Sequence, residues 1–276
     1  MGTRVRKARA LIEGKAKFDG SVPVFYDRFF GPFCFEPYAV ELARRITAEP
    51  GARVLELACG TGILTRRLRA VLPAGTQLVA TDLSAPMLEH ARATLAGADV
   101  HWRTADAQAL PFKDGVFDAV VCQFGLMFLP DKPAGFREAR RVLRPGGIFL
   151  ASTWCAIDEN PAARIVAETI LRLVSDDPPR FHEIPHGFHD VAAIERMARE
   201  AGFHRVEVAC VDLEGRAPSA RHVATGFVRG TPLAAMLAER GIDHEGMIDA
   251  VARALYSGDD AIPYASRLSA LVVTAS

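Results

Sequence analysis

The sequence has no net charge and no paired cysteines. Its 33 Lys and Arg residues balance 33 Asp and Glu residues over 276 positions. A neutral chain argues against nucleic acid as the main partner, because phosphate binding depends on concentrated positive charge. The five cysteines lie far apart without a C-x-x-C pair, which predicts neither a disulfide framework nor a zinc site. We therefore expect a protein of the reducing cytoplasm that binds no nucleic acid and no metal.

Long apolar runs are also missing. No stretch approaches the roughly 18 consecutive apolar residues of a membrane-spanning helix, and the basic start of the chain is not followed by the apolar stretch of a secretory signal. We therefore expect no membrane insertion. Half of the residues are nonetheless hydrophobic, which is enough for a globular protein with a large core.

Between residues 53 and 154, short apolar runs alternate with helix-like stretches. Strands are expected at 53–57, 77–81, 99–106, 116–124 and 148–154, with amphipathic helices among them at 61–72, 84–97 and 132–143. Ser84 is a natural N-cap for the second of these helices. The alternation predicts an α/β fold with a doubly wound, mostly parallel sheet, and ligands of such sheets bind at the carboxyl ends of the strands.

The remaining segments are less regular. A helix is expected at 190–203, with strands at 204–213 and 269–276. Segments 1–48, 154–189 and 214–266 do not fit the alternation, and the first is rich in aromatic residues. We expect one domain over 1–276, with a cofactor-binding core at 49–153 and the three irregular segments forming a helical lid over the carboxyl edge of the sheet.

A small-residue loop follows the first expected strand in VLELACGTG (54–62). Gly60 and Gly62 lack Cβ atoms, so a ligand can approach the backbone closely. Asp82 follows Gly62 by 20 residues at the end of the second strand, where a carboxylate can accept both hydroxyl protons of a ribose. Asp106 ends the next strand, within reach of an adenine edge. These residues predict a pocket for an adenosine-containing ligand.

The loop does not fit the common dinucleotide pattern. A nicotinamide site typically reads G-x-G-x-x-G, but Thr65 stands at the third glycine position. Glu56 precedes the loop and would be unfavourable beside a pyrophosphate, although it suits a cation. A nicotinamide-dependent oxidoreductase is therefore the alternative reading.

The ordered motifs resemble the class I S-adenosylmethionine-dependent methyltransferases. VLELACGTG is similar to their first motif, TDLSAPML (81–88) to the segment with the ribose-binding acid, and ADAQALPF (105–112) to the adenine-binding segment. FDAVVCQFGLMFLPD (117–131) and RVLRPGG (141–147) resemble their fourth strand and the turn before the fifth. The spacing resembles most the branch with the ubiquinone and menaquinone C-methyltransferases. The resemblance implies a seven-stranded Rossmann-like sheet with an antiparallel last strand.

The resemblance also implies the cofactor-binding residues. Asp82 would hold the ribose, Asp106 with the Ala107 amide would read adenine, and Glu56 would lie near the amino end of S-adenosylmethionine. Gln123 would border its methionine portion. The full expected set is Glu56, Ala58, Gly60, Thr61, Gly62, Asp82, Leu83, Met87, Asp106, Ala107 and Gln123.

Two features of this set depart from the family motif or have a second explanation. Ala58 replaces the first glycine of the motif, although alanine is the mildest change. Leu83 and Met87 would sandwich the adenine, but their helical spacing is equally typical of core residues.

Methyl transfer needs orientation and desolvation, and a base only where the acceptor must lose a proton. His189 is our preferred base, from the segment FHEIPHGFHD (181–190) with His182 and His186, and Tyr26 in the aromatic N-terminal cluster is the second candidate. These histidines could instead pack in a loop or bind a metal. We expect methyl transfer to a small-molecule acceptor; an inactive S-adenosylmethionine-binding protein is a further alternative.

Overall fold

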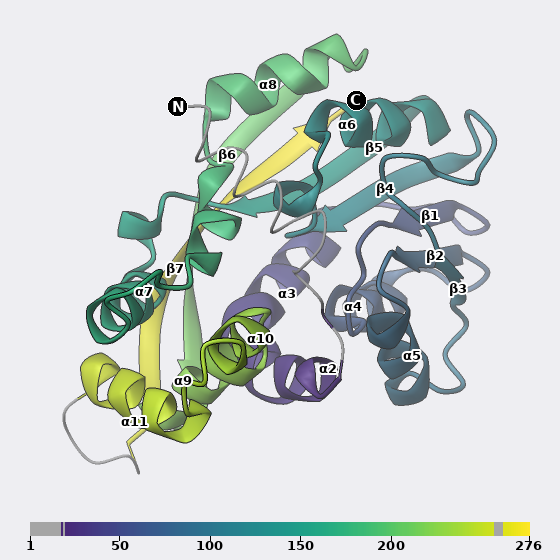
Figure 1. Cartoon of the computed structure of the whole chain (residues 1–276). Coiled ribbons are helices and arrows are strands. Elements are labelled where there is room, and N and C mark those ends of the chain that lie inside the picture. The colour runs from purple at the N-terminus through teal and green to yellow at the C-terminus, as the bar shows by residue number, and fades with distance from the viewer. Residues whose placement is uncertain (1–17, 19, 257–261) are drawn as a thin grey trace.

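A seven-stranded sheet forms the centre of the chain, seen in a computed structural model that describes residues 18, 20–256 and 262–276 (Figure 1). The strands are β1 (Arg53–Glu56), β2 (Gln77–Asp82), β3 (His101–Thr104), β4 (Phe117–Gln123), β5 (Leu143–Trp154), β6 (Val206–Ala217) and β7 (Tyr264–Ala275). Their order is β3-β2-β1-β4-β5-β7-β6. Strands β1 to β5 pair in parallel, and β7 is antiparallel to both β5 and β6. The predicted fold class, with its antiparallel last strand, is confirmed.

The order of the strands reverses between β1 and β4, which is where doubly wound sheets bind their ligands. Both strands are apolar on both faces: Val54 and Leu55 of β1 and Val120 and Val121 of β4 are 0 % exposed. Such continuous apolar runs are typical of parallel strands covered by helices on both sides. The carboxyl ends of these two strands therefore position the candidate site.

The described helices lie on both faces of the sheet and beyond one end of it (Figure 1). They are α2 (Val22–Phe25), η1 (Tyr26–Phe35), α3 (Glu36–Arg45), α4 (Ile63–Val71), α5 (Ala85–Thr94), η2 (Leu126–Phe128), α6 (Lys132–Val142), η3 (Ile157–Glu159), α7 (Pro161–Leu173), η4 (Phe181–Glu183), η5 (Pro185–Gly187), α8 (Val191–Glu200), α9 (Ala220–Arg229), α10 (Leu233–Ala238) and α11 (His244–Leu255). The Ser84 hydroxyl accepts a hydrogen bond from the Met87 amide at 3.4 Å, so the predicted N-cap of α5 is confirmed.

Helices from the three irregular segments gather at one end of the molecule. α9, α10 and α11 are inserted between β6 and β7, α11 packs against α9 and α7, and α9 packs against η1. In Figure 1 this group lies away from α6 and α8. Strands β6 and β7 are longer than expected, so 214–217 and 264–266 are strand. Residues 1–17, 19 and 257–261 of the expected lid segments lie outside the described residues.

Within the described ranges, no helix combines the length and the apolar character that crossing a bilayer requires.

Gly230 allows α9 to end against the backbone of η1. A Cβ atom on Gly230 would lie 2.6 Å from the Gly226 carbonyl oxygen and 3.1 Å from both the Cα and the amide nitrogen of Tyr26. Neither backbone can move away cheaply. We therefore expect Gly230→Ala to lower the free energy of unfolding by about 1–3 kcal/mol, the usual cost of overpacking. Denaturant unfolding measures this; the control Gly187→Ala, whose Cβ would meet nothing within 4 Å, should be near neutral. Equal stability of both variants would contradict close packing of η1 on α9.

Candidate functional site

The loop between β1 and α4 has a backbone that favours glycine. Gly60 and Gly62 have φ angles of 56° and 83°, a region that glycine enters without a Cβ penalty. A Cβ on Gly62 would lie 2.9 Å from a methyl group of Leu95, whereas one on Gly60 would meet nothing within 4 Å. Gly62 thus lets the loop pack against α5, and Gly60 borders open space beside the loop. Thr61 between them is fully buried.

Ala58 also has a positive φ, of 51°, although it has a side chain. The left-handed region costs a non-glycine residue about 1–2 kcal/mol. The position of its methyl group depends on Gly125, because a Cβ on Gly125 would lie only 2.6 Å from the Cβ of Ala58. The loop therefore keeps the glycine-like conformation at Ala58, and the missing side chain at residue 125 leaves room for the extra methyl group.

Asp82 lies beside this loop at the end of β2. Its carboxylate accepts hydrogen bonds from the Gly60 amide at 2.8 Å and from the Ser84 amide at 2.7 Å. Burial raises the pKa of Asp82, and the backbone amides of Ser84, Gly60 and Leu83 act in the opposite direction. The structure thus brings together the glycine loop and the acid that the sequence predicted as neighbours.

The expected adenine-binding residues lie at the ends of β2 and β3. Asp106 accepts hydrogen bonds from the backbone and side-chain amides of Gln108, at 2.8 and 3.1 Å, in the turn after β3. Ala107 is half-buried in this turn. Leu83 is 68 % exposed whereas Met87 is 4 % exposed. Leu83 is therefore not a core residue, while Met87 is buried on α5.

Glu56 and Gln123 each present a buried oxygen without a partner. Glu56 is 1 % exposed, and its Oε2 atom has no hydrogen bond. Gln123 donates from Nε2 to the Phe35 carbonyl at 2.8 Å, but its Oε1 atom has no partner. Glu56 pairs in register with Val121, and alternate residues share a face of a strand, so both side chains point to the same face of the sheet. Two unpaired acceptors at one edge can receive hydrogen bonds from a ligand.

Burial raises the pKa of Glu56 to about 8; the Thr65 hydroxyl lowers it and the charge of Asp82 raises it further. Because the folded protein holds a proton that the unfolded chain loses above its ordinary pKa of 4.5, stability should fall as the pH rises from about 4.5 to about 8. Each unit of pKa difference corresponds to about 1.4 kcal/mol. We therefore expect Glu56→Gln to raise the free energy of unfolding by a few kcal/mol at pH 8.

Denaturant unfolding between pH 5 and 8.5 measures this effect, with Glu207→Gln on the exposed face of β6 as a matched control. The control should keep the wild-type pH dependence. A Glu56→Gln protein that is less stable than wild type at pH 8 would contradict the claim that Glu56 is buried without a compensating charge.

The helix η1 is held over the glycine loop by Asp27. Its Oδ1 atom accepts hydrogen bonds from the Thr61 hydroxyl at 3.1 Å and from Arg66 at 2.9 Å. Sequence reasoning did not identify Asp27, because its partners lie 34 and 39 residues away and no local pattern links them. Asp27 thus ties the N-terminal segment to the predicted cofactor loop.

Tyr26 lies between this loop and an adjoining cavity. Its ring stacks on Phe35 with centroids 4.9 Å apart. Burial raises the pKa of Tyr26 well above its ordinary value, and the nearby charges of Asp82, Cys34 and Asp27 add to this. The phenol therefore keeps its proton at neutral pH, which makes it a hydrogen-bond donor and not a base.

A cavity that is partly open to solvent lies beside Tyr26. Its wall comes from η1, α7, α9, α10, β7, the ends of β4 and β5, and the η2 and η4–η5 turns. Most of the lining is aromatic or aliphatic. Its large rings include Phe30, Phe35, Phe124, Phe128, Trp154 and Phe227. Of the predicted site residues, Tyr26 lines this cavity.

The structure does not bring His189 to the cavity. His189 is exposed, and its Nδ1 atom contacts the His186 carbonyl at 2.7 Å. The η4 and η5 turns direct His182 and His186 to the cavity wall instead. The prediction of His189 as the base therefore lacks support: its ring lies past the second turn, facing solvent.

His186 has one tautomer imposed by its partner. Its Nδ1 atom lies 3.0 Å from the Cys155 carbonyl, which can only accept, so Nδ1 carries the proton and Nε2 is left as an acceptor. Burial lowers the pKa of His186 to about 4, so the ring is neutral at pH 7. His186 is thus a neutral hydrogen-bond acceptor at the cavity.

Comparison with known proteins relates the sheet and its glycine loop to a known family. Residues 54–147 match the family model described as a methyltransferase domain. A demethylmenaquinone methyltransferase of Clavibacter sepedonicus is 34 % identical over 207 residues, covering 68 % of this chain and 82 % of that protein. A ubiquinone/menaquinone biosynthesis C-methyltransferase of Shewanella frigidimarina is 29 % identical over 184 residues, covering 62 % and 72 % of the two chains.

A solved structure shares the fold. Phosphoethanolamine N-methyltransferase 2 of Haemonchus contortus, in complex with S-adenosyl-L-methionine, superposes with a TM-score of 0.61 at 18 % identity, covering 97 % of this chain and 59 % of that one. The named relatives do not favour the nicotinamide-dependent alternative. The glycine loop, the Asp82 carboxylate beside it and the similar proteins support one conclusion: the chain belongs to the class I S-adenosylmethionine-dependent methyltransferases.

Proposed function

We propose that this methyltransferase acts on a small, uncharged and largely apolar acceptor, held in the aromatic cavity beside Tyr26. The composition of the cavity wall is the observation that carries this proposal. Among the described lining residues, Arg267 is the one with a full charge at neutral pH, and none is acidic. A cationic amine would find no counter-charge there, whereas a flat ring would stack on the aromatic side chains.

The residues of the loop fit S-adenosylmethionine. The unpaired Oε2 atom of Glu56 offers an acceptor for a cationic amino group, and Gly60 leaves open space beside the loop. We infer that Asp82 binds the ribose hydroxyls, Asp106 with the Ala107 amide reads the adenine, and the remaining members of the predicted set line the same edge.

When bound, S-adenosylmethionine supplies a methyl group already activated on a sulfonium sulfur. The chain then has to orient the acceptor and exclude water. The aromatic wall excludes water, and the protonated Tyr26 hydroxyl can donate a hydrogen bond to an acceptor oxygen. His186 can accept one through Nε2. We assign both as orienting groups and no longer favour His189 as a base.

We further propose that segments 1–48, 154–189 and 214–266 act together as a lid of the single domain, over the cofactor-binding core at 49–153. The contacts of α9 with η1 and of α11 with α7 support this, because they join all three segments. The Asp27–Thr61 hydrogen bond links the lid to the core.

The two histidines should differ in their effect on turnover. Loss of one hydrogen bond costs about 0.5–1.5 kcal/mol, so His186→Ala should lower kcat/KM for an acceptor with a hydroxyl by roughly 2- to 10-fold. His189→Ala should leave it unchanged, because its ring faces solvent. Steady-state kinetics with both variants measure this. A larger loss in His189→Ala than in His186→Ala would reverse the assignment.

An acceptor screen tests the proposed substrate class. Release of S-adenosylhomocysteine is followed with uncharged phenolic or hydroquinone-type rings, as the names of two relatives suggest, and with charged amines of similar size. Turnover confined to uncharged rings supports the proposal; turnover confined to amines refutes it. Tight S-adenosylmethionine binding without transfer to any acceptor would favour the inactive binding protein instead.

A further inference from the structure

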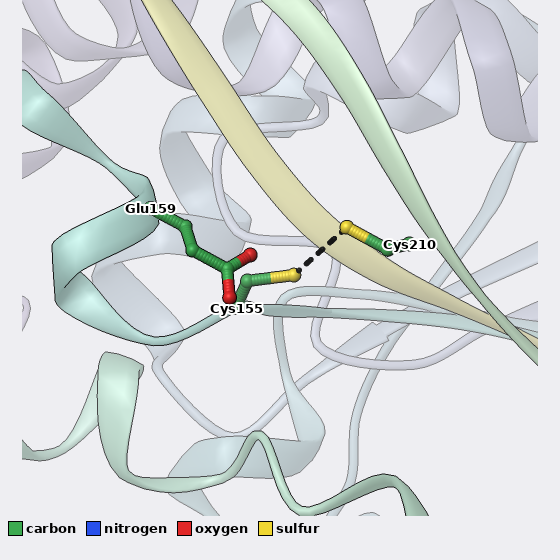
Figure 2. Close-up of side chains that lie close together, drawn as sticks. All are labelled: Cys155, Glu159 and Cys210. Carbon is green, nitrogen blue, oxygen red and sulfur yellow. Dashed lines mark hydrogen bonds between the residues drawn. The ribbon is translucent and has the colours of Figure 1, made fainter.

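A cluster of thiols and carboxylates lies behind the cavity wall, where sequence reasoning expected no metal. Cys155 follows β5, Glu159 ends η3, and Cys210 lies on β6. One ligand atom from each lies within 4.8 Å of the others, and the two sulfur atoms are 3.4 Å apart. Figure 2 shows the sulfur of Cys155 directed toward that of Cys210 across the ribbon of β7, with the Glu159 carboxylate beside it.

Further polar groups surround this cluster. The Ser269 hydroxyl on β7 lies 3.3 Å from the Cys210 sulfur and 3.3 Å from the Glu159 carboxylate, and it contacts Asp212 at 2.5 Å. The Cys210 sulfur lies 4.0 Å from the same carboxylate oxygen of Asp212. Two thiols, two carboxylates and a hydroxyl therefore converge on one region of the sheet.

The cluster lacks a protein cation. In the described part of the chain, neither Glu159 nor Asp212 forms an ion pair with Lys, Arg or His, in contrast to the nearby Glu214 and Glu168. A bound cation can supply the positive charge that the surrounding side chains do not. The site thus has the donors of a metal centre without a competing counter-charge.

A disulfide fits this geometry poorly. Strand β7 lies between β5, which Cys155 follows, and β6, which carries Cys210, and two strand spacings place the two backbones roughly 9 Å apart. Disulfides have Cα atoms about 4.4–6.8 Å apart. By contrast, two thiolates bound to tetrahedral Zn²⁺ at about 2.3 Å would lie about 3.8 Å from each other, close to the observed 3.4 Å.

We propose that Cys155, Cys210 and Glu159 form a binding site for a thiophilic divalent metal ion such as Zn²⁺. Two sulfur ligands and one carboxylate suit zinc among the common divalent ions. Asp212 or a water molecule can complete a tetrahedral set. The ion would have a structural role, since it would fix residues that hold the wall of the acceptor cavity. The carbonyl of Cys155 orients His186, and Asn160 both lines the cavity and binds the backbone of Ser269.

Titration with Co²⁺ tests the proposal directly, because cobalt replaces zinc and reports thiolate ligands through sulfur-to-metal charge-transfer absorption. The 276-residue chain, reduced and treated with a chelator, is titrated without cofactor or acceptor, so failure here is separate from failure of the proposed function. We expect one equivalent to bind with tetrahedral cobalt absorption, and added Zn²⁺ to displace it.

Variants locate the ion. Cys210→Ser, at an exposed position that should not disturb folding, is expected to remove part of the charge-transfer absorption and to weaken binding by at least about 100-fold, since even outer-shell partners of metal ligands contribute about 10–100-fold. Glu159→Gln should weaken binding without loss of the sulfur absorption. Asp158→Asn, from the same short helix, is the matched control and should bind like wild type. No thiolate absorption at one equivalent, or unchanged binding in Cys210→Ser, would overturn the proposal.

Discussion

Replacing Asp82 with alanine is expected to weaken S-adenosylmethionine binding by about 100-fold or more. A hydrogen bond to a charged group contributes about 1.5–3 kcal/mol, and a carboxylate between two ribose hydroxyls makes two of them. The substitution also removes the acceptor for the Gly60 and Ser84 amides, which loosens the loop. Calorimetric titration with S-adenosylmethionine measures the loss.

Two further variants separate binding from folding. Asp82→Asn keeps the size of the side chain and one acceptor, so we expect an intermediate loss. Asp99→Ala removes an exposed acid just before β3, at the opposite edge of the sheet from Asp82, and should bind like wild type. A folded Asp82→Ala protein with an affinity within about threefold of wild type would show that Asp82 does not hold the ribose.

Replacing Gly60 with valine is expected to abolish measurable cofactor binding while the protein stays folded. A Cβ on Gly60 meets no atom within 4 Å, so a larger side chain would fill the space beside the loop instead of clashing with the core. A valine side chain in that space would displace a bound cofactor, and every loss of about 1.4 kcal/mol of contact energy lowers the affinity tenfold. The positive φ of 56° adds only about 1–2 kcal/mol of backbone strain.

Gly97→Val provides a matched control for this strain. Gly97 also has a positive φ, of 83°, and open space around its Cβ position, but it lies beyond the end of α5. Both variants should lose similar stability in denaturant unfolding, while only Gly60→Val loses binding in calorimetry. Equal affinities in the two variants would mean that the space beside Gly60 is not part of the cofactor site.

The sequence predicted the core of the sheet well because the relevant signals are local. The apolar runs at β1, β2 and β4 and the N-cap Ser84 each depend on neighbours within a few residues. The proximity of Gly60 and Asp82 then followed from the rule that parallel strands end at a common edge.

The acceptor side could not be predicted in the same way. Its cavity combines six or more chain segments, and neither Trp154 nor Phe227 has a local signal that it faces a ligand. The ten-residue π-helix η1 contains Pro32 and depends on contacts with α9 for its position. Which histidine reaches the cavity, His186 or His189, depends on the direction of the turns η4 and η5. Each turn is only three residues long, and so short a sequence does not determine its direction.

A crystal structure of the complex with S-adenosylhomocysteine would test the central claim most directly. We expect Asp82 within hydrogen-bond distance of both ribose hydroxyls, the amino group of the product near the Oε2 atom of Glu56, and its sulfur facing the cavity beside Tyr26. Product bound elsewhere, or bound with its sulfur directed away from that cavity, would contradict both the assigned cofactor site and the proposed acceptor pocket.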